Sequence, residues 1–170
     1  ARRSGVLDRL TLWATANEST NLSRSVGQRQ GRRLRGVPDL DDAHEAGGRR
    51  SRECTLILTE GKSAKALAVA GLSVVGRKLY GVFPLRGVPL NVSGASFQRI
   101  SDNTEISAIL KIMGLTPMKP AERGKLRYGS IMIMADQDVD GSHIKGLLLN
   151  VFRRFFPETF SWPGFFKVFH

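Results

Sequence analysis

The chain has 170 residues, which is the size of one ordinary domain. Lys and Arg outnumber Asp and Glu by 26 to 15, and the net charge of +11 indicates either a polyanionic partner, such as nucleic acid or an acidic membrane surface, or a basic tail on a soluble domain. The single cysteine, Cys54, excludes an internal disulfide and a cysteine-based zinc site. No apolar stretch approaches the roughly 20 residues that span a bilayer.

The first fifty residues differ in composition from the rest of the chain. Val6, Leu10 and Trp13 have helical spacing, which predicts a helix near residues 4–14. Residues 15–36 are polar and rich in arginine, which is typical of a flexible linker or of an arm that binds a polyanion. We therefore expect a helix and a mostly irregular basic arm in residues 1–50, followed by one domain in residues 51–170.

Apolar runs and amphipathic segments alternate from residue 53 onward. Strands are predicted at residues 54–59, 80–87, 130–136 and 164–169, and helices at residues 60–72, 104–115 and 140–156. Strands and helices that alternate over short loops predict an α/β fold with an open, mainly parallel sheet flanked by helices. Pro84 predicts that the second strand ends or bulges at that position.

Three aspartates, Asp136, Asp138 and Asp140, follow the third predicted strand at every second position. Functional groups collect at the carboxyl ends of parallel strands, so we expect Glu60, just after the first strand, to lie near Asp136. Mg²⁺ prefers oxygen ligands and is usually held by one or two carboxylates together with phosphate oxygens. The pattern therefore favours a magnesium site for phosphodiester chemistry, with a basic surface that holds the polyanion.

Three other interpretations of the aspartate triplet stay open. An EF-hand calcium loop matches through Gly141, but its twelfth residue is Leu147 where a glutamate is needed, and a strand precedes it. A phosphatase with an aspartyl nucleophile needs a lysine and further acids downstream, where Glu158 is the sole acid. A solvated acidic turn at a helix N-terminus explains one or two aspartates more easily than three.

Four segments resemble a known family: GVPDLDDAHEAGG (36–48), TLILTEGKSAKALAVAGLSVVGR (55–77), YGVFPLRG (80–87) and LRYGSIMIMADQDVDGSHIKGLL (126–148). They resemble the Toprim domain in the DNA-cleavage core of eukaryotic type II DNA topoisomerases, and the resemblance covers nearly all of residues 31–156. Residues 3–14 resemble the helix that leads out of the ATPase-side transducer in those enzymes. The resemblance implies a Rossmann-like Toprim fold, Mg²⁺-dependent cleavage and religation of double-stranded DNA, and use of ATP by the full enzyme at a site outside this chain.

The resemblance also implies roles for individual residues. Glu60 and Asp136 resemble the pair that binds the catalytic magnesium ion, Asp136 and Asp138 the pair that binds a second ion, and Asp140 completes the acidic triplet. Mn²⁺ or Ca²⁺ is expected to substitute for Mg²⁺ in binding. The positions that resemble DNA-binding residues are Lys65, Arg86, Asn91, His143 and Lys145. For the two lysines and the histidine, a second interpretation as solvated helix residues stays open.

The chain departs from the family pattern in three ways. Lys62 replaces an acid, and a cation two residues from a metal-binding glutamate weakens the binding of the ion by Coulomb repulsion. Val88 replaces a lysine that contacts DNA in the family. The nucleophilic tyrosine belongs to a winged-helix domain absent from this chain, and Tyr80 and Tyr128 resemble core or sheet-edge residues. We therefore expect no catalytic nucleophile here and no DNA cleavage by this chain alone.

The expected partners are double-stranded DNA, the ATPase–transducer and winged-helix domains, and a second copy in a homodimer of the full enzyme, with no membrane. The expected location is the nucleus, with an organelle as the alternative. Two other functions compete with the cleavage module. One is a DNA-binding Toprim module with a degenerate metal site and no catalysis, and the other is a Toprim nuclease or a primase-like protein.

Overall fold

The computed structural model describes residues 34–86, 103–116, 119–135 and 139–168, without the side chains of residues 139–143 and 168. Strands β1 (Thr55–Glu60), β2 (Tyr80–Leu85), β3 (Ser130–Met134) and β4 (Phe166–Val168) form one sheet. The strand order is β2-β1-β3-β4, and every neighbouring pair is parallel. The predicted α/β fold with an open parallel sheet is confirmed.

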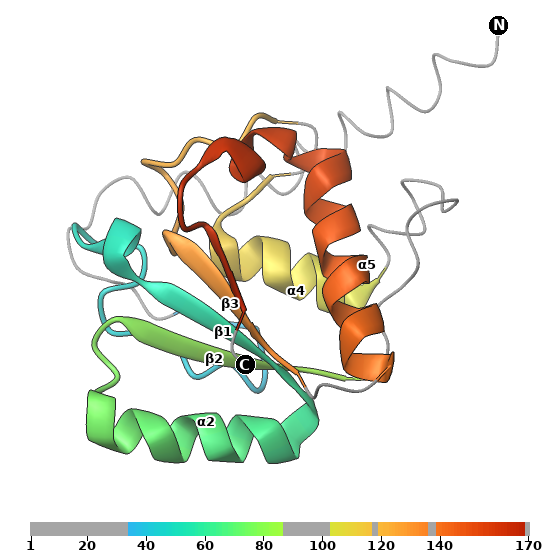
Figure 1. Cartoon of the computed structure of the whole chain (residues 1–170). Coiled ribbons are helices and arrows are strands. Elements are labelled where there is room, and N and C mark those ends of the chain that lie inside the picture. Colours follow the sequence, from blue (N-terminus) through green and yellow to red (C-terminus); the bar gives the residue numbers. More distant parts are fainter. Residues whose placement is uncertain (1–33, 87–102, 117–118, 136–138, 169–170) are drawn as a thin grey trace, which may run out of the picture.

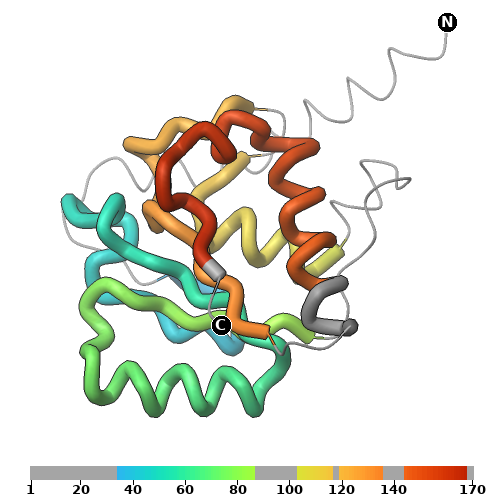
Figure 2. Tube along the Cα trace, in the orientation of Figure 1, coloured from blue at the N-terminus to red at the C-terminus, as the bar shows by residue number. Residues whose placement is uncertain are grey.

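In the described part of the chain, three helices flank the sheet: α2 (Gly61–Val75), α4 (Thr104–Met113) and α5 (Val139–Phe155). Helix α2 covers one face, and α4 and α5 cover the other, as the ribbon and the Cα trace show (Figures 1 and 2). A short 3-10 turn, η1 (Ser51–Glu53), precedes β1, and a second one, η2 (Pro157–Ser161), follows α5. The helix predicted near residues 4–14 lies outside the described residues.

Local sequence sets the ends of α4. The side chain of Asn103 accepts hydrogen bonds from the backbone N–H groups of Glu105 and Ile106, at 3.1 and 3.0 Å, and so caps the first turn. Gly114 ends the helix in the left-handed conformation, with a φ of 75°, which glycine adopts without steric cost. These are the start and stop groups that the sequence offers at the predicted boundaries.

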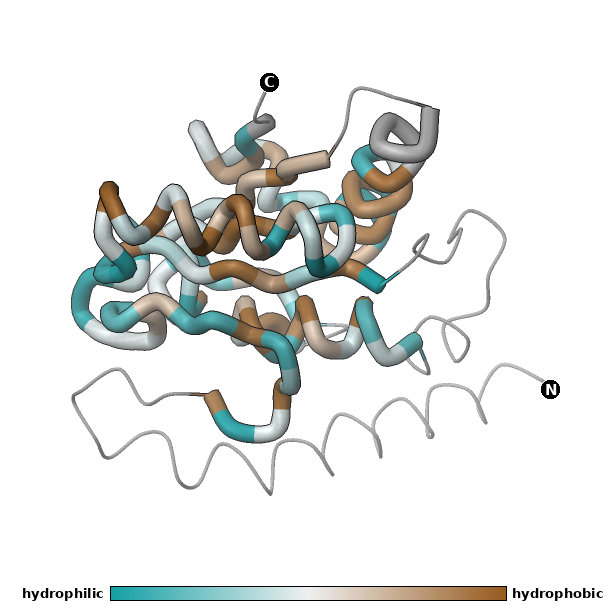
Figure 3. Tube along the Cα trace, turned by 90° about the horizontal axis from the view of Figure 1, so that it is seen from below, coloured by the Kyte–Doolittle hydropathy of each residue, from teal (hydrophilic) through white to brown (hydrophobic). Residues whose placement is uncertain are grey.

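The central strand β1 is buried from Thr55 to Thr59 because helices cover both faces of the sheet. Leu56 and Leu58 pack into the larger buried cluster with residues of α4 and α5, whereas Ile57 packs with Ala68 and Leu72 of α2. This alternation follows from the two-residue period of a strand. Figure 3 shows that hydrophobic residues gather on the strands and helices and that the connecting loops are more hydrophilic.

The prediction for Pro84 is wrong: β2 passes through Pro84, which pairs with Thr59, and ends at Leu85. The reason is the position of β2 at the edge of the sheet. The N–H of Val82 points away from β1 and donates to the carbonyl of Asp41, at 2.8 Å. Two residues on, the nitrogen of Pro84 faces the same outer side. An N–H group at this position would not reach β1, so proline costs no hydrogen bond between the two strands.

Residues 34–50 pack against the sheet ahead of η1. Asp41 and Val82 form an antiparallel bridge on the outer edge of β2, and Ala43 and Ala46 are buried. The described part of the predicted arm is therefore joined to the domain by backbone hydrogen bonds and by apolar contacts. The predicted domain boundary at residue 51 stays a prediction, and we propose that the folded unit includes residues 34–50.

Candidate functional site

The carboxyl ends of β1, β2 and β3 meet at one edge of the sheet because the three strands are parallel neighbours. Glu60 is the last residue of β1 and pairs with Leu85, the last residue of β2. On the other side, Thr59 pairs with Met134, the last residue of β3. The half-buried Glu60 and the half-buried Ala135, which follows Met134, thus lie at the same edge.

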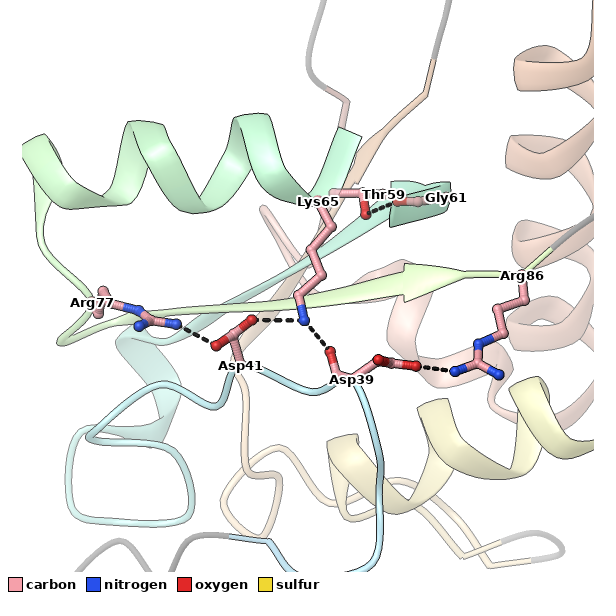
Figure 4. Close-up of polar contacts among 7 residues, drawn as sticks. All are labelled: Asp39, Asp41, Thr59, Gly61, Lys65, Arg77 and Arg86. Atoms are coloured by element: carbon pink, nitrogen blue, oxygen red, sulfur yellow. Dashed lines mark hydrogen bonds and ion pairs between the residues drawn. The ribbon is translucent and has the colours of Figure 1, made fainter. Parts of the chain in front are cut away.

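The turn from β1 into α2 fixes where Glu60 leaves the sheet. Gly61 has a φ of 75°, which suits glycine, and an added Cβ would meet nothing within 4 Å, so conformation alone calls for glycine there. The buried hydroxyl of Thr59 donates to the carbonyl of Gly61 at 3.2 Å and braces the turn (Figure 4). Glu60 is the residue that this turn presents at the edge.

Most predicted metal ligands lie where the structure describes little. Asp136 and Asp138 are outside the described residues, and Asp140 lies on α5 in the part without described side chains. Within the described part of the chain, no group of three or more His, Cys, Asp or Glu residues could hold a metal ion. Glu60 is the only predicted metal ligand whose side chain belongs to the described part, and the convergence of all four stays a prediction.

Lys65 points from α2 to the loop ahead of the domain (Figure 4). Its ammonium group pairs with the carboxylate of Asp41 at 2.8 Å and donates to the backbone carbonyl of Asp39 at 2.6 Å. The side chain is 19% exposed. Lys65 therefore holds this loop in the described structure, and its predicted contact with DNA stays a prediction.

Arg86 directly follows β2 and lies at the same edge as Glu60. Its guanidinium donates to the carboxylate of Asp39 (Figure 4). Its backbone N–H donates to the carboxylate of Glu105. The Arg86 side chain is 63% exposed. An exposed guanidinium at this edge suits a predicted DNA contact better than the enclosed Lys65 ammonium does.

The other predicted positions are described less fully. Lys145 lies half-exposed on α5, whereas the side chain of His143 on the same helix is not described. Asn91 and Val88 lie outside the described residues. Lys62, the departure from the family, is exposed in the first turn of α2.

The sequence interpretation missed the roles of three aspartates in residues 39–42, here called the acidic loop. Asp41 pairs with Lys65 and also with Arg77, at 2.5 Å, and Asp39 pairs with Arg86. Burial tends to raise the pKa of Asp41, but its hydrogen bonds with Lys65 and Arg77 outweigh burial, and the pKa is lowered. The sequence offered one signal for these roles: three of the four residues 39–42 are acidic, and they follow an arginine-rich segment.

Asp42, the third aspartate, anchors the acidic loop to the region before β3. It accepts from Arg127, at 2.5 Å, and from the hydroxyl of Tyr128, at 2.5 Å. The same hydroxyl accepts from the backbone N–H of Ala43, and Tyr128 is fully buried. Burial, with the charge of Asp42, raises the pKa of Tyr128. Tyr128 is thus a core residue with a satisfied hydroxyl.

Comparison with known proteins places this geometry in a family. The Toprim domain family matches residues 55–162. DNA topoisomerase 2 of Pisum sativum is 56% identical over 168 residues, covering 98% of this chain and 11% of the relative. DNA topoisomerase 2 of Drosophila melanogaster is 49% identical over 165 residues, covering 95% of this chain and 11% of the relative.

A solved structure agrees with these relatives. The DNA-binding, cleavage and re-ligation domain of Plasmodium falciparum topoisomerase II matches with a TM-score of 0.78 and 54% identity, covering 81% of this chain and 19% of that one. Among the described residues, no helix is long and apolar enough to cross a membrane. The chain spans about a tenth of the length of the DNA topoisomerase 2 relatives. It belongs to the Toprim domain family and corresponds to the Toprim segment of eukaryotic type II DNA topoisomerases.

Proposed function

We propose that this chain is the magnesium-dependent DNA cleavage and religation module of an ATP-dependent type II DNA topoisomerase. The observation that carries the proposal is the register of β1 and β3. Thr59 pairs with Met134, so the residues that follow, Glu60 and Ala135, leave the sheet at the same edge. Asp136 is the next residue along the chain. The similarity to DNA topoisomerase 2 over nearly the whole chain supports the same function.

The donor set fits a magnesium ion. Glu60, Asp136, Asp138 and Asp140 would hold it, and carboxylate oxygens are the ligands that Mg²⁺ prefers, with Mn²⁺ or Ca²⁺ able to replace it in binding. When bound, the ion stabilises the negative charge that develops on the reacting phosphate and on the leaving oxygen. The chain's own part is to gather these carboxylates at one edge of the sheet, where they lie beside basic groups.

The basic groups hold the DNA backbone in this proposal. Arg86 presents an exposed guanidinium at the carboxyl edge, and Asn91, His143 and Lys145 are assigned to the same groove. Lys65 is assigned there as well, although its ammonium is held by the acidic loop. Phosphate contacts of this kind position the duplex without reading its sequence.

The remaining functions are assigned to other parts of a longer enzyme. In this proposal a winged-helix domain supplies the nucleophilic tyrosine, an ATPase–transducer region hydrolyses ATP, and two copies act as a homodimer on double-stranded DNA in the nucleus. The relatives are about nine times longer than the matched segment, which leaves room for such domains.

Isothermal calorimetry with MgCl₂ or MnCl₂ tests the metal site directly. We expect saturable binding by the parent chain and a loss of affinity of at least about tenfold in the Glu60→Gln variant and in the Asp136→Ala, Asp138→Ala double variant. The matched control is Glu53→Gln, an exposed glutamate just before β1, at the opposite edge of the sheet. Equal binding by the parent chain and Glu60→Gln, or no binding by a folded parent, contradicts the proposed site.

Lys62 gives a specific reason to keep one alternative, a DNA-binding module with a degenerate metal site. Its charge lies two residues from Glu60, but the side chain is exposed, so water and salt screen the repulsion. We therefore expect the parent chain to bind the ion, with a lower affinity than the Lys62→Asp variant. The degenerate module is supported instead if the parent chain binds duplex DNA but no metal, and if Lys62→Asp restores metal binding.

A further inference from the structure

Arg86 is held from two sides at the edge of the sheet. Its backbone N–H donates to the carboxylate of Glu105 in the first turn of α4, and its guanidinium Nη2 donates to Oδ2 of Asp39 (Figure 4). Arg86 follows Leu85, which pairs with Glu60. The direction of the Arg86 side chain relative to Glu60 is therefore set by the acidic loop as well as by the sheet.

Asp39 has a backbone conformation that few side chains adopt. Its φ is 65°, and it is the only residue other than glycine with a positive φ in the described part of the chain. Its backbone carbonyl accepts from the Lys65 ammonium at 2.6 Å, which fixes the turn in place. Residues in costly backbone conformations persist where the surroundings determine them, and they gather at functional sites. Asp and Asn tolerate this conformation better than most residues.

The contact with Asp39 leaves most of the Arg86 guanidinium available. The hydrogen bond to Asp39 uses Nη2, whereas a guanidinium carries five N–H donors. The side chain is 63% exposed, so the other donors can reach a ligand in solution. A long side chain that is already ordered loses less entropy when it binds a phosphate. The Asp39 carboxylate is charged at neutral pH, and the hydrogen bond from Arg86 lowers its pKa below the ordinary value of 3.8.

We propose that Asp39 is a positioning residue for DNA binding. It orders the Arg86 guanidinium at the edge of the sheet where β1 ends at Glu60, with its other N–H donors exposed to solvent, where a phosphate of the DNA backbone binds. The inference rests on the proposed function, because it takes double-stranded DNA as the ligand. It adds a residue outside the matched segment 55–162 to the DNA-binding site.

Fluorescence anisotropy with a short labelled duplex and the full chain tests this role. The variant is Asp39→Asn, which keeps the size of the side chain and tolerates a positive φ. Removal of a negative charge by itself strengthens binding to a polyanion, so the control is Glu53→Gln, with the same change of charge at the opposite edge of the sheet. We expect unchanged or tighter binding for Glu53→Gln and roughly three- to tenfold weaker binding for Asp39→Asn.

A double variant separates positioning from general damage. In an Arg86→Ala background, Asp39→Asn is expected to cause no further loss of affinity, because the group that Asp39 orders is gone. Tighter binding by Asp39→Asn, equal to that of Glu53→Gln, would overturn the proposal and show that Asp39 shields Arg86 from DNA. A further loss in the double variant would overturn it as well.

A measurement without DNA distinguishes failure of this inference from failure of the proposed function. ¹⁵N relaxation of the Arg86 Nε–H group, assigned with Arg86→Ala, is expected to show an ordered side chain in the parent and a mobile one in Asp39→Asn. Equal mobility in both overturns the ordering by Asp39 whatever the DNA result. A parent chain that orders Arg86 but binds no duplex overturns the proposed function, and with it the DNA role of Asp39.

Discussion

Lys65 and Arg86 were assigned the same role by resemblance, yet their side chains have different surroundings. The Lys65 ammonium is enclosed between the Asp41 carboxylate and the Asp39 carbonyl, whereas the Arg86 guanidinium is mostly exposed. An enclosed charge that loses its partner leaves an unpaired group behind, and an exposed pair contributes little to stability. The two cations should therefore respond differently to substitution.

We predict that Lys65→Met lowers the free energy of unfolding by about 1–2 kcal/mol, because Asp41 and the Asp39 carbonyl lose a charge-assisted partner. Urea denaturation followed by circular dichroism measures the change. The matched control is Lys62→Met, an exposed lysine three residues earlier on α2, which should leave the urea midpoint unchanged. Equal midpoints for the parent chain and both variants would show that the Lys65 contact contributes nothing.

The same contact has a pH signature. The pKa of Asp41 in the folded chain is below its ordinary value of 3.8, so its pairing stabilises the fold above about pH 4 and is lost as the pH falls through the folded pKa. Urea titrations between pH 3 and pH 6 should therefore show a smaller difference between the parent chain and Lys65→Met at the acidic end. A difference that grows with acidity would contradict this assignment.

At the scale of elements, β2 is wedged between β1 and the acidic loop. Gly81 leaves room for the Tyr128 side chain: an added Cβ would meet the Tyr128 hydroxyl at 2.2 Å and the Asp41 carbonyl at 3.1 Å. Alanine is usually better than glycine inside a strand because it restricts the unfolded chain. At this position the contact with a buried ring should reverse that preference.

We predict that Gly81→Ala destabilises the fold by about 1–3 kcal/mol, the usual cost of overpacking a core. Thermal or urea unfolding measures it. Gly71→Ala is the control, because Gly71 lies on α2 with nothing within 4 Å of the added Cβ, and it should stabilise the helix by about 0.5–1 kcal/mol. Stabilisation by both substitutions would mean that Tyr128 does not occupy the space beneath β2.

At the scale of the whole molecule, the matched family segment and the folded unit differ in extent. The family match begins at residue 55, but residues 34–50 cover the outer edge of β2 and bring Asp42 to Arg127 and Tyr128. Without this segment, the Tyr128 hydroxyl would lose both of its hydrogen-bond partners. A buried polar group without a partner is costly.

We predict that residues 54–170 alone do not fold cooperatively, whereas residues 34–170 do. The shorter chain loses the apolar contacts of Ala43 and Ala46 and leaves the Arg127 guanidinium without the Asp42 carboxylate. Urea unfolding of both chains, followed by circular dichroism, provides the comparison. Cooperative unfolding of the shorter chain at the midpoint of the longer one would place the boundary after residue 53 and refute the larger unit.

The sequence by itself determined the order of elements and the edge at which Glu60 lies. Strand and helix periods are local properties, and parallel strands that alternate with helices bring their carboxyl ends together. It also determined the family, because the glutamate motif and the aspartate motif are each a short, uninterrupted stretch of sequence. It failed at Pro84, because only the assembled sheet shows that β2 is an edge strand whose nitrogen at that position faces away from β1.

Only the tertiary structure decided the partners of the acidic loop. Asp39 reaches Arg86 across 47 positions and Asp42 reaches Tyr128 across 86, separations over which no local period or motif spacing carries information. The choice of partner depends on where β2 and β3 lie once the sheet has formed and on which charges can be desolvated together. That choice separated the enclosed Lys65 from the exposed Arg86, two cations that the resemblance assigned to DNA binding together.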